Sequence, residues 1–70
     1  MYELRILFDR EEDGRWIAEV EEIPGALAYG ATREVARRKG QAIALHAIAE
    51  RVEHGENVPG LDHIAFADDL

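Results

Sequence analysis

The segment from Pro24 to Thr32 has the outline of a phosphate-binding loop. Gly25 and Gly30 stand five residues apart, and Thr32 precedes a run of helix-forming residues. A phosphate loop also needs a lysine to reach the outer phosphates, and Ala31 occupies that position. We therefore interpret the segment as a strand-to-helix corner. Pro24 and Gly25 end a strand, Gly30 turns the chain, and Thr32 caps the helix that follows.

A row of possible metal ligands is formed by His46, Glu50 and His54. Their spacing of four residues places them on one side of a helix, where two imidazoles and a carboxylate could hold zinc. Such a site would need a further ligand, and His54 falls at the expected end of the helix. We interpret the row as a solvated face and expect neither a metal ion nor a cofactor.

Glu11, Glu12 and Asp13 form a carboxylate cluster that could bind a divalent cation or take part in acid and base catalysis. The cluster lies at the tip of a predicted hairpin, and catalytic carboxylates need a cleft that shifts their pKa values. The only hydroxyl of the serine type is that of Thr32, which is assigned to a cap. We therefore expect no enzymatic activity, and we expect the acids to keep the tip soluble or to contact a basic partner.

The composition predicts one small acidic domain over residues 1–70. The 15 acidic and 8 basic residues give a net charge of −7, which repels phosphate backbones. Arg33, Arg37, Arg38 and Lys39 form a basic patch, but no aromatic residue is interleaved with it. Direct binding to nucleic acid is therefore not expected.

The location of the protein is predicted from what the sequence lacks. There is no cysteine, which fits a reducing compartment. No stretch is apolar enough to span a membrane, and an acidic cluster follows the N-terminal apolar residues where a signal peptide would need a cleavage site. We expect a cytoplasmic protein.

Alternation and turn residues predict the secondary structure. We expect strands at residues 2–9, 15–22, 26–29 and 63–67, and a helix from Thr32 to about His54. Asp13 and Gly14 suit the turn of a hairpin between the first two strands. The C-terminal sequence Asp-Asp-Leu is expected to fray. The fold class is therefore α+β in the order β-β-β-α-β, with a small antiparallel sheet packed on one long helix.

The predicted helix has two apolar stripes. The stripe expected to face the sheet consists of Ala36, Gly40, Ile43, Ala44 and Ala47. The second consists of Leu45, Ile48 and Val52, which one small sheet is not expected to cover. We interpret these three residues as an oligomer interface and expect a homo-oligomer, most simply a dimer.

A set of matched positions extends from the second strand to the helix. It comprises Ala18, Glu19, Val20, Glu22, Pro24, Gly25, Gly30, Thr32, Glu34 and Ala36. With these residues the chain resembles the HicB-like antitoxin family, whose members have an Ala-Glu-Val strand end, a Pro-Gly break, a Gly and Thr turn and an acidic helix start. The sequence departs from the family pattern at Glu21, which replaces a proline, at Ala26, which replaces a cysteine, and at Val35, which replaces a second acid.

The resemblance implies a domain like a truncated ribonuclease H fold without its catalytic acids. It also implies a partner, a HicA-like toxin, which is a small basic protein that cleaves mRNA and is neutralised when the antitoxin covers it. Many relatives carry a further C-terminal DNA-binding domain, and the resemblance here is to the N-terminal domain alone. The residues expected to contact the toxin are Glu11, Glu12, Asp13, Glu19 and Glu21. The alternatives are an orphan oligomerising domain of the same fold and a small-ligand or metal-binding module.

Overall fold

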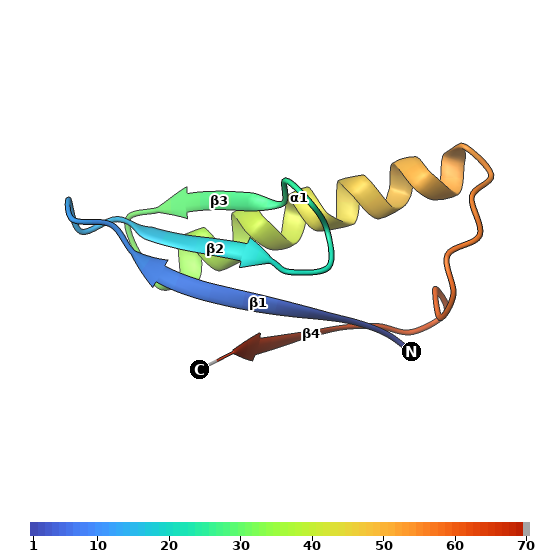
Figure 1. Cartoon of the computed structure of the whole chain (residues 1–70), viewed down its shortest axis with the longest axis horizontal. Coiled ribbons are helices and arrows are strands. Elements are labelled where there is room, and N and C mark those ends of the chain that lie inside the picture. Colours follow the sequence, from blue (N-terminus) through green and yellow to red (C-terminus); the bar gives the residue numbers. More distant parts are fainter. Residues whose placement is uncertain (70) are drawn as a thin grey trace.

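A computed structural model describes residues 1–69 and consists of four strands and one helix (Figure 1). The elements follow the order β1 (Tyr2–Arg10), β2 (Trp16–Val20), β3 (Leu27–Gly30), α1 (Arg33–Glu53) and β4 (Ile64–Asp69). The predicted α+β class and the order β-β-β-α-β are confirmed, and the element boundaries agree with the prediction to within two residues.

The sheet is mixed, so the prediction of an antiparallel sheet is wrong for one of its strands. The strand order is β3-β2-β1-β4, in which β1 and β2, and β2 and β3, are antiparallel. β4 lies parallel to β1, with Tyr2 opposite Ile64 and Leu4 opposite Phe66. The reason is the connection: α1 carries the chain back along the sheet, as a crossover between parallel strands must, and β4 then starts from the same end as β1.

A tight turn joins β1 to β2 at the predicted place. The amide of Glu11 donates to the carbonyl of Arg15 at 2.8 Å, and the amide of Gly14 donates to the carbonyl of Glu11 at 3.0 Å. Gly14 has a φ of 91°, a conformation that residues with a Cβ atom rarely adopt. The hairpin register follows from this turn and sets Phe8 opposite Ala18 and Ile6 opposite Val20.

The segment that resembled a phosphate loop is the expected strand-to-helix corner. Gly25 has a φ of 84° in the turn after β2. A Cβ atom at Gly30 would overlap the backbone nitrogen of Ala36, so only glycine allows the end of β3 to approach the helix so closely. The Thr32 hydroxyl accepts a hydrogen bond from the Val35 amide at 3.1 Å and caps α1 as predicted.

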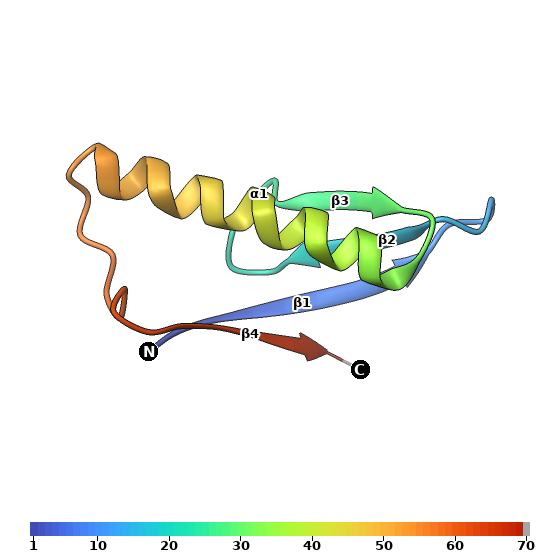
Figure 2. The same cartoon turned by 180° about the vertical axis from the view of Figure 1, so that it is seen from behind.

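The helix covers one face of the sheet, mainly over β2 and β3 (Figure 2). Its buried residues are Ala36, Gly40, Ala44 and Ile48. Two assignments made from the sequence are therefore wrong: Ile48, placed in the oligomer stripe, is 3% exposed, and Ile43, placed against the sheet, is 39% exposed. The buried row advances in steps of four residues and so winds around the helix axis, which turns Ile48 inward and Ile43 outward.

The core lies between α1 and the strands. Leu4, Ile6 and Ala18 have no exposed surface, and Val20 has 1%. Small residues dominate where α1 crosses β2 and β3: Gly40 lies over Ala18, where an added Cβ atom would contact the methyl group of Ala18 at 3.4 Å. The C-terminal turns of α1 extend beyond β2 and β3, and the chain returns from there to β4 (Figure 1).

The acidic C-terminal residues are ordered rather than frayed, which corrects the prediction for Asp68 and Asp69; Leu70 lies outside the described residues. Both belong to β4. Asp68 accepts hydrogen bonds from Arg37 at 2.8 Å and from Arg33 at 3.4 Å. The Arg33 guanidinium also lies 3.9 Å from the centre of the Phe8 ring. The basic start of α1 therefore fastens the edge strand.

Candidate protein-binding face

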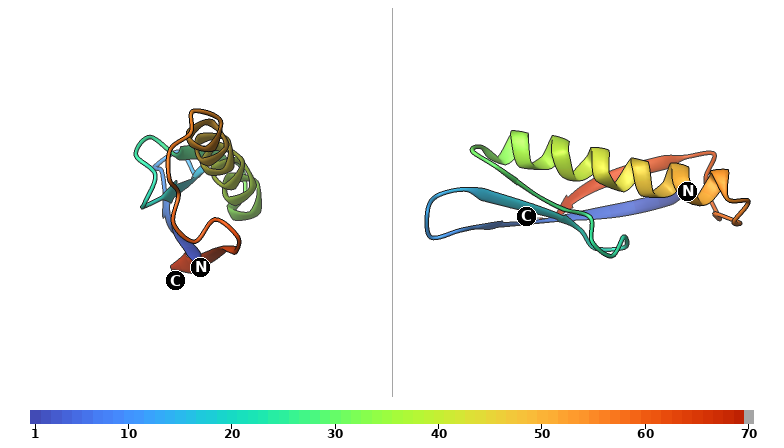
Figure 3. Two further views of the ribbon diagram at one scale, coloured as in Figure 1. Left: turned by 90° about the vertical axis from the view of Figure 1, so that its right-hand side faces the viewer. Right: turned by 90° about the horizontal axis from the view of Figure 1, so that it is seen from above.

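The side of the sheet opposite α1 is covered by no other element of the described chain, and we call it the open face (Figure 3). Side chains alternate between the two faces along each strand. Because Leu4, Ile6, Ala18 and Ala28 point toward the core, their neighbours point outward. Beyond the alanines of β4, the side chains of the open face are those of Glu3, Arg5, Leu7, Asp9, Ile17, Glu19, Leu27, Tyr29 and Asp69.

Four apolar side chains of the open face lie on three adjacent strands, β1, β2 and the edge strand β3, and we call them the apolar centre: Leu7, Ile17, Leu27 and Tyr29. The register places Tyr29 opposite Ile17, and Glu19 between Leu7 and Leu27. Leu27 and Tyr29 are each 39% exposed, although they are large and apolar. A cluster of this kind at a strand surface is typical of a surface that binds another protein.

Acidic side chains lie beside the apolar centre, toward the end of β2. Glu19 is exposed within the face itself. Glu21 lies 3.7 Å from Arg5, and Glu22 accepts a hydrogen bond from the Arg5 amide at 2.8 Å. The pair of Glu21 and Arg5 is more than half exposed on both sides, so it contributes little to stability. These charges therefore remain accessible to a partner.

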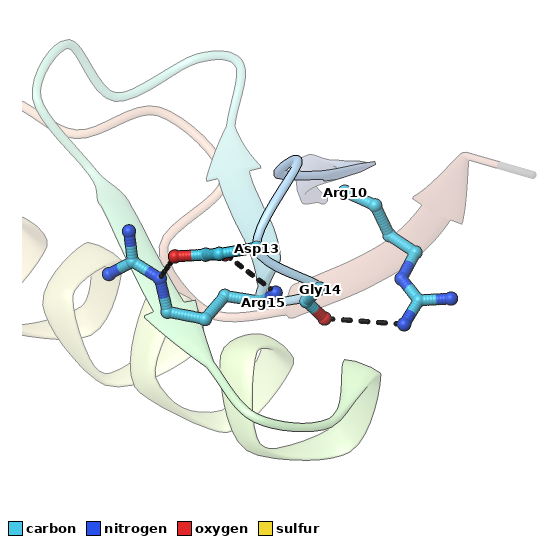
Figure 4. A network of polar contacts seen from close by, with 4 residues as sticks. All are labelled: Arg10, Asp13, Gly14 and Arg15. Carbon is cyan, nitrogen blue, oxygen red and sulfur yellow. Dashed lines mark hydrogen bonds and ion pairs between the residues drawn. The ribbon is translucent and has the colours of Figure 1, made fainter.

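The hairpin end of the open face holds a small polar network (Figure 4). The two Asp13 carboxylate oxygens accept hydrogen bonds from the Arg15 amide at 3.0 Å and from the Arg15 guanidinium at 2.8 Å. The bond from the Arg15 amide lowers the pKa of Asp13 below its ordinary value, and the guanidinium acts in the same direction. Arg15 lies 4.7 Å from the centre of the Tyr29 ring, which ties the network to the apolar centre.

A shallow concavity of about 380 Å³ lies at the same tip and is lined by Glu11, Glu12, Asp13 and Arg15. Among residues 1–69 no polar or charged side chain is fully buried. The polar residues of this tip are thus surface groups in contact with solvent.

The five acidic residues predicted to contact a partner do not form one compact patch. Glu11, Glu12 and Asp13 lie at the hairpin tip, Glu21 lies beyond the other end of β2, and Glu19 lies between them. The apolar centre lies between the hairpin tip and Glu21.

The exposure of Leu27 and Tyr29 had a signal in the sequence. In β3 they alternate with Ala28 and Gly30, and the small residues are the ones that suit the close approach of α1. The large ones must then face away.

Within residues 1–69 no group of three histidine, aspartate or glutamate side chains is arranged to hold a metal ion, so His46, Glu50 and His54 are not gathered into such a group. Over the same residues, no helix combines the length and the apolar character that crossing a membrane requires.

Comparisons of the chain with protein-family models, with curated proteins and with solved structures gave no match.

Proposed function

We propose that this protein is a HicB-like antitoxin that acts in the cytoplasm, has no catalytic activity and neutralises a small basic HicA-type toxin by covering the surface with which the toxin cleaves mRNA. The observation that supports this proposal is the open face, on which the apolar centre lies beside acidic side chains such as Glu19 in a chain of net charge −7.

The strand order is compatible with the proposed family. The resemblance implies a single helix and four strands in the order β-β-β-α-β, and the chain has this order of elements. The same arrangement leaves one side of the sheet free for a partner.

The chemistry of the open face suits a basic protein. Apolar and aromatic side chains at the centre of an interface supply most of its binding energy, because they are fully removed from water. Charges around them act mainly on the rate of encounter and on the choice of partner. Leu27 and Tyr29 would anchor the toxin, and Glu19 would face its basic side chains.

The test is co-expression with a small basic protein encoded beside this one, scored by cell growth and by co-purification. Leu27→Asp and Tyr29→Ala should each weaken binding by about 30-fold, the effect of losing one strong anchor. Ile43→Asp is a matched control, because Ile43 is also 39% exposed but lies on α1, away from the open face. It should rescue growth as well as the unchanged protein does.

Salt dependence provides a second measurement. Because exposed charges are screened beyond about 8 to 10 Å at physiological ionic strength, association should slow as salt is added, and dissociation should change less. Glu19→Lys should slow association and flatten its salt dependence while leaving the circular dichroism spectrum unchanged.

The proposal fails if no basic partner co-purifies, or if the isolated protein itself degrades RNA. If a toxin binds and Leu27→Asp has no more effect than Ile43→Asp, the open face is not the binding surface. A chain without a toxin partner would leave the orphan oligomerising domain as the function that fits best.

A further inference from the structure

Helix α1 carries an exposed apolar row on the side away from the sheet. The row consists of Ala42, Leu45, Ala49 and Val52, and we call it the outer row. All four residues are exposed, and Leu45 and Val52 are each 42% exposed. Their spacing of three, four and three residues is that of the seam between two helices in a coiled coil.

The outer row and the sheet-facing row lie on different sides of the same helix. At 100° per residue, the row from Ala36 to Ile48 that packs on the sheet and the outer row are centred about 140° apart. The helix can therefore pack on its own sheet and on a second helix at the same time. The burial of Ile48 removes it from this surface, and Ala42 and Ala49 complete the row in its place.

The sizes of the residues in the outer row favour an antiparallel partner with the same sequence. In an antiparallel pair, Ala42 meets Val52 of the second helix and Leu45 meets Ala49, so each layer combines a small side chain with a larger one. In a parallel pair, each residue meets its own copy. Layers of two alanines would then alternate with layers of two leucines or two valines. Uniform layers pack without voids more readily.

The charges beside the outer row favour the same orientation. Lys39 and Glu53 flank the row on one side, two heptads apart, and both are exposed. Within residues 1–69, neither takes part in an ion pair. An antiparallel pair brings Lys39 of each copy beside Glu53 of the other, whereas in a parallel pair these two residues lie two heptads apart and do not meet.

The exposed surface of the chain leaves room for such an association. A folded monomer of 7.9 kDa exposes about 4,400 Å². This chain exposes 4791 Å² and extends 41 × 21 × 15 Å. The larger exposed surface area fits an elongated molecule in which one side of the helix is not covered by its own sheet.

We propose that two copies of this chain form an antiparallel pair through the outer rows of their α1 helices, with Lys39 of each copy beside Glu53 of the other. The open face takes no part in this contact. The pair therefore presents two open faces, and its formation does not depend on the antitoxin function.

Sedimentation equilibrium tests the contact. The unchanged protein should show a species of twice the 7.9 kDa chain mass that dissociates on dilution. Leu45→Asp should leave monomers only, whereas Ile43→Asp, at a similarly exposed position on the other flank of α1, should leave the association unchanged. Circular dichroism checks that both variants keep the helix. A chain that is monomeric at all concentrations, or a dimer that Leu45→Asp does not affect, overturns the proposal.

A charge exchange tests the orientation. Lys39→Glu replaces two attractive pairs with two repulsive ones and should raise the dissociation constant about tenfold. The double variant Lys39→Glu, Glu53→Lys should restore the original value. If the double variant remains as weak as Lys39→Glu, the two residues do not face each other, and the antiparallel pair is excluded.

Cross-linking gives an independent measure of orientation, because the chain has no cysteine. A mixture of Lys39→Cys and Glu53→Cys should form a disulfide-linked heterodimer under mild oxidation, while each variant alone should remain largely uncrosslinked. Glu12→Cys, at the hairpin tip, serves as the control for random collision. Efficient cross-linking within either single variant would place two copies of the same residue side by side and contradict the proposal.

Discussion

The two faces of the sheet are formed by the same strands, but one is buried under α1 and the other is exposed. Along β1, Ile6 has no exposed surface and belongs to the core, while the next residue, Leu7, lies on the open face. Along β2, Ala18 is buried and Glu19 is exposed. The core therefore lies on one face, and the proposed binding surface lies on the other. Because the faces alternate residue by residue, substitutions at neighbouring positions can separate effects on stability from effects on binding.

The largest contrast is expected between Ile6 and Leu7. Ile6→Ala removes buried methyl groups and leaves a cavity, so it should lower the free energy of unfolding by about 2 to 5 kcal/mol. Leu7→Ala removes a partly exposed side chain and should cost less than about 1 kcal/mol. Urea unfolding followed by circular dichroism measures both. Equal losses would mean that the open face contributes to the core and that the two faces are not separate.

A smaller contrast is expected between Asp68 and Asp69, which are neighbours in β4 on opposite faces. Asp68→Ala removes the partly buried acceptor of Arg33 and Arg37 and should lower the free energy of unfolding by about 1 to 2 kcal/mol. Asp69→Ala should change it by no more than about 0.5 kcal/mol, as exposed substitutions usually do.

The same unfolding experiment decides this second comparison. In high salt the difference between the two variants should shrink but persist, because the pairs at Asp68 are only partly accessible to solvent. Indistinguishable variants would show that the arginines do not fasten the edge strand.

The smallest effect is expected at Asp13, beside the open face. Its carboxyl should titrate below the ordinary pKa of 3.8 in a carbon NMR titration. Since the folded pKa is the lower one, any stabilisation by the bonded carboxylate is present above pH 3.8 and is lost as the pH falls through the folded pKa. Arg15→Met keeps the backbone amide, the largest cause, and should raise the pKa only part of the way. A pKa that returns fully to 3.8 would assign the effect to the guanidinium instead.

The local features of the fold could be predicted from the sequence because they depend on neighbouring residues. Alternation defined β1, Asp13 and Gly14 defined the hairpin, and the Gly30 to Thr32 corner defined the start of α1. Each rests on backbone conformation or on a hydrogen bond a few residues away. Such local interactions can be inferred from the residue types at neighbouring positions in a single sequence.

The features that the sequence did not disclose depend on how distant elements meet. The parallel pairing of β4 and the role of Asp68 require the position of β1 and of the two arginines of α1. The burial of Ile48 and the exposure of Ile43 depend on how the helix crosses the sheet. The crossing moves the buried row of residues around the helix axis. The apolar centre follows from the same crossing, because the small residues of β3 had to face the helix.

The pairing of β4 with β1 also imposes an order of events during synthesis. β1 leaves the ribosome before the other elements. It can pair with β2, which pairs with β3, and α1 can then pack on these strands while β4 has yet to be made. Until then, the side of β1 that will hold β4 has free amides and carbonyls next to a half-covered apolar surface, a state prone to pair with other chains. The pairing of β4 with β1 brings Tyr2 beside Ile64, which are far apart in the described sequence. Because closing so long a loop costs chain entropy, we expect this pairing to form slowly. Arg33 and Arg37 are made before Asp68. Their hydrogen bonds to Asp68 hold β4 on β1, and β4 then covers the exposed edge of β1.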